Sequence, residues 1–405
     1  MENTVYLLKV DPGANNNKFY TMIPDSEEMF HAEYGRVGLS KQIATYPMSK
    51  WNAKYREKLR KGYHDQTDLH SSQISVVEGK GKYQEIAEAA IREIVERLQR
   101  LAKKVIKENY TVSSDAVTDR MVQEAQRLLD DLVRITDVYT FNRKLVELFN
   151  TIPRFMTQVA SYIAVDSGDF RKIIQREQDL LDTMRTQVQD REVLEVPSGG
   201  DMSKTILEAH GLRFRETKDS DVQRILRHLG DLKVHFKNAW CVENIKTQKA
   251  FDAYLEENQI EGQRPEVKLY WHGSKNGYWW SIINDGLLLR PTGVVTNGNM
   301  FGHGLYFANK AGKSKGYTSL DGAYWTHGTE PFGFMALYAV AYGKPYHVYD
   351  SDPRYYDFNY QALRSACPQA NCLHAHAGSA LRNDEIIVYS ESQATIKYLV
   401  ELKAA

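Results

Sequence analysis

The stretch DEIIVY, at residues 384–389, joins two acidic side chains to a β-branched run near the end of this 405-residue chain. Isoleucine and valine favour strands, so a strand is expected to begin here. Glu385 opens that run, and we expect its side chain to lie at a strand end facing a cleft. Local sequence alone leaves an alternative, a surface glutamate at the start of a strand.

Two upstream segments complete a pattern with this strand. The first is WHGS at residues 271–274, and the second is GLYFA at residues 304–308, which is followed by Lys313, Ser314 and Tyr317. Each segment is a weak signal by itself. Their fixed order and their neighbours leave little room for coincidence.

In this order and context, His272, Tyr306 and Glu385 resemble the catalytic signature of the poly(ADP-ribose) polymerase family. The resemblance implies an ADP-ribosyltransferase domain, of mixed α/β structure with two packed, mostly antiparallel sheets, that uses NAD+ as its substrate. Nicotinamide leaves NAD+ as a neutral molecule, so no general acid is required. Cleavage of the nicotinamide–ribose bond is accelerated when NAD+ is held in a fixed pose, when a negative charge lies near the developing oxocarbenium ion and when the nucleophile is polarised.

The resemblance also gives each residue of the site a role. Glu385 would hold a ribose hydroxyl of NAD+ and activate the acceptor hydroxyl, and His272 would bind the adenosine ribose. Gly273 and Ser314 would bind the nicotinamide carboxamide, since glycine lets a ligand approach the backbone closely. The aromatic rings of Tyr306 and Tyr317 would sandwich the cationic nicotinamide. The catalytic residues are thus predicted to be Glu385, His272 and Tyr306, and the NAD+-binding residues His272, Gly273, Ser274, Tyr306, Ser314 and Tyr317.

Residues 1–75 are expected to form a small β-rich domain. Residues 5–10 and 18–23 read as paired strands around a turn, and residues 49–61 as a helix rich in lysine and arginine. Such a basic patch can bind the phosphates of a nucleic acid. The alternative is a solvated helix face with no ligand. The segment YGRVG at residues 34–38 is similar to the core of the WGR domain, a DNA-break-sensing module, with tyrosine in place of tryptophan. The resemblance implies DNA contacts by Tyr34, Gly35, Arg36 and Lys41.

Residues 76–195 are expected to form an all-α helical bundle. Apolar residues recur at three- and four-residue steps over 86–105 and again over 117–135, and residues 113–115 offer an N-cap for the second helix. The sequence itself shows only a plain bundle. Its position and the segment at residues 148–153 resemble the helical regulatory domain of DNA-dependent members of the family, which implies an autoinhibitory lid. Residues 196–200 read as a linker before the catalytic domain at 204–405, which completes a multidomain α+β fold.

Composition narrows the class of protein. Lysine plus arginine equals aspartate plus glutamate at 52 each, so any nucleic-acid surface must be local. Three cysteines indicate a reducing, intracellular compartment. The N-terminal residues lack the pattern of a signal peptide, and no apolar run is long enough to span a bilayer. We therefore expect an intracellular, DNA-associated protein with no membrane partner, in the nucleus if the host is eukaryotic and in the cytoplasm or nucleoid if it is bacterial.

Three further patterns concern metal binding, phosphate binding and the surroundings of the NAD+ site. Cys367, Cys372, His374 and His376 fit no common structural zinc spacing, so no metal is expected. Residues 312–314 end like a P-loop, but Phe307 stands where its first glycine is required. Residues 290–302 read as a flexible loop beside the NAD+ site, in which Met300 resembles an acceptor-site contact.

Together these patterns predict an NAD+-dependent protein ADP-ribosyltransferase. We expect it to build poly(ADP-ribose), to modify itself and other proteins, and to respond to damaged or nicked DNA. One alternative is single ADP-ribose transfer. Another, from a different class, is a DNA-end-binding scaffold whose transferase is vestigial.

Overall fold

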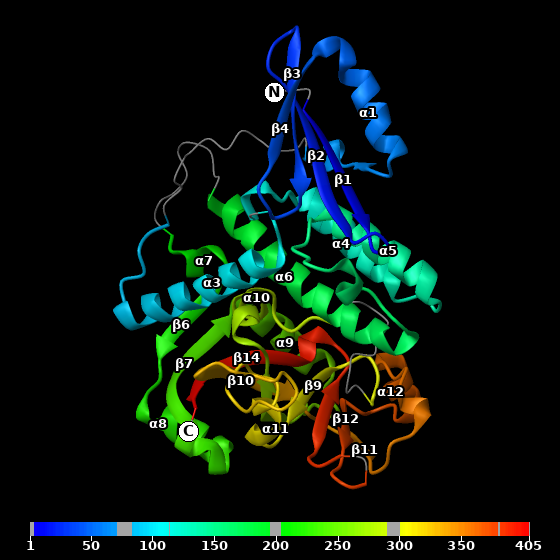
Figure 1. The fold of residues 1–405 in the computed structure, drawn as a ribbon. Coiled ribbons are helices and arrows are strands. Elements are labelled where there is room, and N and C mark those ends of the chain that lie inside the picture. The colour runs from blue at the N-terminus through cyan, green and yellow to red at the C-terminus, as the bar shows by residue number, and fades with distance from the viewer. Residues whose placement is uncertain are drawn as a thin grey trace. The chain divides into compact units, whose positions relative to one another are not determined.

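The computed structural model describes residues 4–70, 83–112, 114–194, 204–289, 300–379 and 381–404 (Figure 1). The chain folds into two compact units. The first, which we call unit 1, comprises residues 1–80 and 103–195, and unit 2 comprises residues 81–102 and 196–405. The multidomain α+β fold expected from the sequence is confirmed. The linker expected at residues 196–200 lies outside the described residues.

Unit 1 begins with a five-stranded sheet in the order β4-β3-β2-β1-β5. The strands are β1 (Val5–Asp11), β2 (Asn16–Pro24), β3 (Met29–Arg36), β4 (Gln42–Pro47) and β5 (His64–Asp65). Strands β1 and β2 pair antiparallel from Val5 opposite Met22 to Asp11 opposite Asn16, so the predicted hairpin is correct.

The predicted basic helix is present as α1 (Trp51–Arg60). Its Trp51 and Tyr55 pack against a core in the sheet that includes Tyr20 and Phe30. The Trp51 and Phe30 rings meet edge to face with centroids 4.9 Å apart, a favoured aromatic geometry. The helix is therefore anchored by its aromatic residues, which leaves its charged residues at or near the surface.

The helical part of unit 1 contains α2 (Thr67–His70), α4 (Asp119–Leu132), α5 (Val138–Thr151) and α6 (Phe170–Leu194). The apolar face predicted for the second helix is buried in α4, whose Met121, Leu129 and Leu132 are almost inaccessible. The N-cap predicted at residues 113–115 is wrong. Residues 114–116 form a short 3-10 turn instead, and the Thr118 hydroxyl accepts the Met121 amide at 3.2 Å.

Helix α3 (Ala89–Asn109) is shared between the two units. The apolar residues of its first half belong to the main core of unit 2, where Leu98 is fully buried and Ile94 nearly so. Arg97 of the same half pairs with the buried Glu401 at 2.8 Å. This part of α3 is thus built into the core of the C-terminal unit.

Unit 2 contains a sheet of nine strands in the order β11-β12-β13-β9-β8-β10-β14-β7-β6. All neighbouring pairs are antiparallel except β11 and β12. Strands β8 and β9 share a single residue pair, Trp271 opposite Ala308, so the sheet consists of two parts with a narrow junction. The strands are β6 (Leu212–Glu216), β7 (Phe236–Asn244), β8 (Val267–Gly273), β9 (Leu305–Ala308), β10 (Phe332–Ala341), β11 (Pro345–Val348), β12 (Cys372–Ala375), β13 (Glu385–Val388) and β14 (Ala394–Lys403).

Short helices surround this sheet. They are α7 (Ile206–Ala209), α8 (Asp219–Leu229), α9 (Ile245–Glu257), α10 (Trp279–Asp285), α11 (Ala311–Lys315) and α12 (Tyr360–Ala366). Within the described ranges, none of the helices has both the length and the apolar character that a membrane span requires.

Candidate active site

The three sequence segments meet at the junction between the two parts of the unit 2 sheet. Ala308 of β9 lies opposite Trp271 of β8 on one side and opposite Glu385 of β13 on the other. Strands β8 and β13, whose residues Trp271 and Glu385 are more than a hundred positions apart in the chain, therefore flank the same strand, β9. The pairing places the predicted histidine, tyrosine and glutamate on three consecutive strands of the sheet.

His272 is held on β8 as a neutral ring. Its Nδ1 lies 3.1 Å from the Tyr306 carbonyl oxygen, and its ring meets the edges or faces of Trp279, Phe307 and Tyr338. Burial lowers the pKa of His272, against the opposing effect of the Tyr306 carbonyl. A neutral ring whose Nδ1 carries the proton leaves Nε2 as an acceptor, which suits a hydroxyl group of a ligand.

Gly273 ends β8 where α11 approaches most closely. A Cβ atom at this position would overlap the carbonyl oxygen of Ser314. The sequence interpretation assigned this glycine to ligand approach alone, and the structure adds a packing reason. The contact places the buried Ser314 directly beside Gly273. Ser274 follows the strand, and its carbonyl accepts the Trp279 Nε1 proton at 3.3 Å.

Tyr306 and Tyr317 both lie close to the acidic residue of the site. The charge of Glu385 contributes to a raised pKa for both phenols, after the larger effect of burial, and the pKa of Tyr317 rises to about 12. The Tyr306 hydroxyl donates to the Gly302 carbonyl at 2.9 Å, which fixes the ring. Tyr317 stacks on Trp325 with centroids 6.1 Å apart.

Glu385 is a buried carboxylate, since only 5% of the residue is exposed. The surface alternative is therefore wrong. Its Oε1 forms an ion pair with Lys313 Nζ, while Oε2 is buried and has no hydrogen-bond partner among the described residues. Burial raises the pKa of Glu385, and the nearby Lys313 ammonium only partly offsets that effect. A buried acceptor without a donor is costly, and a ligand hydroxyl would relieve that cost.

Two neighbours of the site were not predicted as functional. Lys313 belongs to the quoted motif, but its sequence context gives no indication that its partner is Glu385. Trp325 lies in an irregular segment and is 60% exposed, so no periodic pattern marks it. Of the loop predicted at 290–302, residues 290–299 lie outside the described residues. Met300, at its end, packs partly against the core around Phe301 and Leu373.

The residues predicted to bind DNA are on or beside β3 of unit 1. Arg36 donates to the carbonyls of Asn15 at 2.7 Å, Met156 at 3.2 Å and Thr157 at 2.8 Å, so its guanidinium already holds three backbone groups. Lys41 pairs with Glu33. The Tyr34 ring lies 5.7 Å from the Tyr20 ring, and Gly35 approaches the Ser40 carbonyl closely. Their role in DNA binding stays a prediction.

Comparison with known proteins bears on both units. Residues 220–404 match the family model described as the poly(ADP-ribose) polymerase catalytic domain, and residues 3–69 match the WGR domain. The chain is a member of the poly(ADP-ribose) polymerase family with a WGR domain. The resemblance noted in the sequence is thereby confirmed. A catalytic domain of this family transfers ADP-ribose and uses NAD+ as its substrate, and a WGR domain indicates nucleic-acid binding.

Individual relatives are distant. The chain is 29% identical over 209 residues to the uncharacterized protein 101L of Invertebrate iridescent virus 6, a match that covers 51% of this chain and 85% of the relative. It is 26% identical to chicken poly [ADP-ribose] polymerase 1, over 46% of this chain and 20% of that protein. It is also 26% identical to chicken protein mono-ADP-ribosyltransferase PARP3, over 47% of this chain and 38% of that protein.

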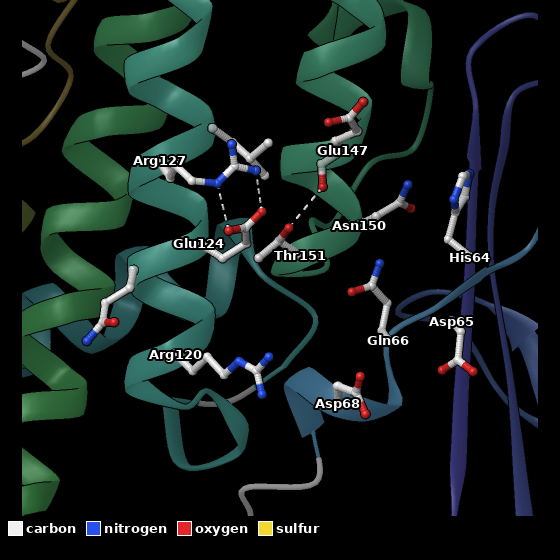
Figure 2. A pocket seen from close by; sticks show the side chains of 12 residues that line it. His64, Asp65, Gln66, Asp68, Arg120, Glu124, Arg127, Glu147, Asn150 and Thr151 are labelled. Carbon is white, nitrogen blue, oxygen red and sulfur yellow. Dashed lines mark hydrogen bonds and ion pairs between the residues drawn. The ribbon is translucent and has the colours of Figure 1, made fainter.

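One hollow found among the described residues does not belong to this site. It is a cavity of about 610 Å³ in unit 1, lined by β5, the segment that follows it, α4 and α5 (Figure 2). Four carboxylates line it, Asp65, Asp68, Glu124 and Glu147, against two guanidinium groups. One of these, Arg127, is already paired with Glu124 at 2.6 Å. This charge balance disfavours the pyrophosphate of a dinucleotide, so the family motifs and not the cavity define the candidate site.

Proposed function

We propose that this poly(ADP-ribose) polymerase family member elongates ADP-ribose chains on itself and on other proteins, and that damaged DNA activates it. The observation that carries the proposal is the environment of Glu385. A buried carboxylate with one oxygen paired to Lys313 and the other without a donor can accept a hydrogen bond from a ribose hydroxyl. Such a pose brings its negative charge close to the carbon that loses nicotinamide.

Each group of the site then has a task in the transfer. His272 Nε2 accepts a hydroxyl of the adenosine ribose, while Tyr306 and Tyr317 hold the nicotinamide ring. Loss of neutral nicotinamide leaves an oxocarbenium ion that the Glu385 carboxylate stabilises. The acceptor hydroxyl attacks the same carbon, and its proton passes to Glu385 or to solvent. When that acceptor is a ribose of an ADP-ribose chain, the chain grows by one unit.

Activation by DNA is proposed from the N-terminal domain. The WGR match and the basic residues of α1, such as Arg56 and Arg60, support a phosphate-binding surface in unit 1. The helical region between residues 76 and 195 is proposed as an autoinhibitory lid, and the domain boundaries near 75 and 195 are part of that proposal. Binding to DNA would place the protein in the compartment that holds the DNA, which is the nucleus in a eukaryotic host and the cytoplasm or nucleoid in a bacterial one.

Single ADP-ribose transfer is the second candidate. It is favoured by the similarity to a chicken protein named as a mono-ADP-ribosyltransferase. A glutamate at position 385 is compatible with both products, because transfer to a protein side chain and to a ribose hydroxyl uses the same carboxylate. The length of the product decides between them.

The test is incubation of the purified chain with NAD+, with and without nicked duplex DNA, followed by a denaturing gel. A DNA-dependent ladder of modified protein is expected. Glu385→Gln should abolish the ladder and spare some NAD+ binding, whereas Glu257→Gln, on the exposed end of α9, should leave it intact. One DNA-independent band would indicate single transfer, and DNA binding without nicotinamide release would indicate a scaffold.

A further inference from the structure

Three histidines gather at the edge of the unit 2 sheet, beside the strand that carries Glu385. His347 of the edge strand β11 lies directly opposite His374 of β12 in the parallel pairing. His376 lies just past the end of β12, and its ring stacks on the His374 ring, so the two imidazoles share one side. The topology thus places three imidazoles on one face, although the first and the second are 27 positions apart in the sequence.

The rings are close enough to share one ion. One nitrogen from each ring lies within 4.8 Å of the corresponding nitrogens of the other two. His347 Nδ1 and His376 Nε2 are 2.7 Å apart, and the His374 and His376 rings stack with centroids 4.1 Å apart. Zinc–nitrogen bonds of about 2.0–2.1 Å set tetrahedral ligand atoms about 3.3 Å apart. To reach this arrangement the side chains rotate, and His374 exchanges one of its present contacts, with the Tyr342 hydroxyl at Nδ1 or with Asp384 at Nε2, for the ion.

A carboxylate supports two of these rings. Asp384 Oδ2 lies 2.9 Å from His374 Nε2 and 3.8 Å from His376 Nδ1. Its other oxygen accepts the Ala377 amide at 2.8 Å, which fixes the carboxylate in place. Metal-binding histidines commonly have such a carboxylate beside them, which orients the rings and raises their basicity.

We propose that His347, His374 and His376 bind a divalent transition-metal ion of the zinc class, with Asp384 as the carboxylate of the site. Imidazole is a preferred ligand of zinc, cobalt, nickel and copper, while calcium and magnesium prefer sets made only of oxygen. His347 is exposed, which gives the ion a path from solvent. The bound ion joins β11 to β12 and reaches the residue immediately before Glu385.

The cysteines considered in the sequence are not needed for this site. The Cys372 thiol is buried and donates to the Tyr342 carbonyl at 3.2 Å. The four-residue set Cys367, Cys372, His374 and His376 is therefore replaced by one that includes His347. His347 was not among the residues considered from the sequence, because the pairing of β11 with β12 is a tertiary contact.

The test measures zinc binding to the whole chain, prepared without an affinity tag and stripped with a chelator. Zn2+ is titrated in competition with a chromophoric chelator, and Co2+ is titrated while its visible absorption is recorded. One ion per chain is expected, with the intense absorption of tetrahedral cobalt. His347→Ala and His376→Ala should each weaken binding by about 10- to 100-fold or more, and Asp384→Asn by about 10- to 100-fold.

Two control variants sharpen this experiment. His64→Ala removes an exposed histidine of unit 1, and Cys367→Ser removes a partly accessible thiol of unit 2 that could bind zinc by itself. Both should bind zinc as the unmodified chain does. Absence of stoichiometric binding, or equal binding by His347→Ala and the unmodified chain, would overturn the proposal and leave a metal-free stack of imidazoles. Circular dichroism of each variant verifies that the fold is retained.

Discussion

Lys313 Nζ forms an ion pair with Glu385 Oε1 and so links helix α11 to the first residue of β13. Both side chains are largely buried, which strengthens their interaction relative to a pair in water. Burial raises the pKa of Glu385 and Lys313 opposes that rise. The pair therefore sets the pH at which the carboxylate becomes available for the reaction.

Removal of the Lys313 charge should shift the pH dependence of the enzyme. Without the ammonium group the pKa of Glu385 rises further, so the carboxylate is protonated at a higher pH. The acid limb of the nicotinamide-release profile is therefore expected to move to higher pH in Lys313→Met, with a larger loss of rate at pH 6 than at pH 8. The control is Lys315→Met, two residues away on α11. An unchanged acid limb in Lys313→Met would show that Lys313 does not control this group.

Gly273 should not tolerate a side chain. A Cβ in Gly273→Ala would overlap the Ser314 carbonyl and force β8 and α11 apart, a form of overpacking that costs about 1–3 kcal/mol. The shift would also displace Ser314, so NAD+ turnover should fall by more than the stability loss explains. Gly312→Ala on α11 is the matched control, because its Cβ would meet nothing within 4 Å. Equal stability and turnover in the two variants, measured by denaturant unfolding and nicotinamide release, would contradict the packing argument.

Leu98 offers a test of the proposed lid that keeps the chain intact. Deleting residues 76–195 would also remove buried residues of α3 from the core of unit 2. Leu98→Ala should instead loosen α3 by a cavity cost of about 2–5 kcal/mol, and DNA-independent activity should rise if the helical region restrains the enzyme. Arg100→Ala, at an exposed position of the same helix, should change neither the stability nor the DNA-independent activity. A folded Leu98→Ala protein with an unaltered basal rate would refute autoinhibition through α3.

Arg36 has two separable roles to test. Its three carbonyl contacts predict that Arg36→Ala destabilises unit 1, by about 0.5–1.5 kcal/mol for each hydrogen bond lost. A direct DNA contact predicts in addition that the slope of log K against log salt concentration, for binding to nicked DNA, falls by about one in Arg36→Ala. The Lys41 side chain does not make these carbonyl contacts, so Lys41→Ala should affect DNA binding and not the stability of unit 1. If Arg36→Ala changes stability but not the salt dependence, the residue is structural.

The buried pair of Arg154 and Glu177 should dominate the electrostatic contribution to the stability of unit 1. Each side chain is only 2% exposed, so Glu177→Ala leaves a buried guanidinium without its carboxylate. The expected loss is about 3–5 kcal/mol in the free energy of unfolding. In the same unit, Glu147→Ala breaks a more exposed pair with Lys144 and should cost less than about 1 kcal/mol. Similar midpoints for the two variants in urea would contradict this difference.

Much of the local structure follows from the sequence. The β1–β2 hairpin, the basic helix α1, the apolar face of α4 and the strand that Glu385 begins were all predicted, because alternation, turn residues and helical periodicity act over short distances. The N-cap was missed since Ser114, Asp115 and Thr118 all offer capping oxygens, and only the backbone course after residue 113 selects Thr118.

The sequence by itself determined which chemical groups this protein has and in what order its motifs come, because family motifs and periodic patterns are local properties of the chain. Tertiary structure alone decided which of these groups meet. In the folded chain Lys313 pairs with Glu385, and the first half of α3 packs in the core of unit 2. Arg36 donates hydrogen bonds to carbonyls far away in the sequence, and His347 lies beside His374. Such contacts depend on strand order and on the packing of residues far apart in the chain, and no short segment encodes them.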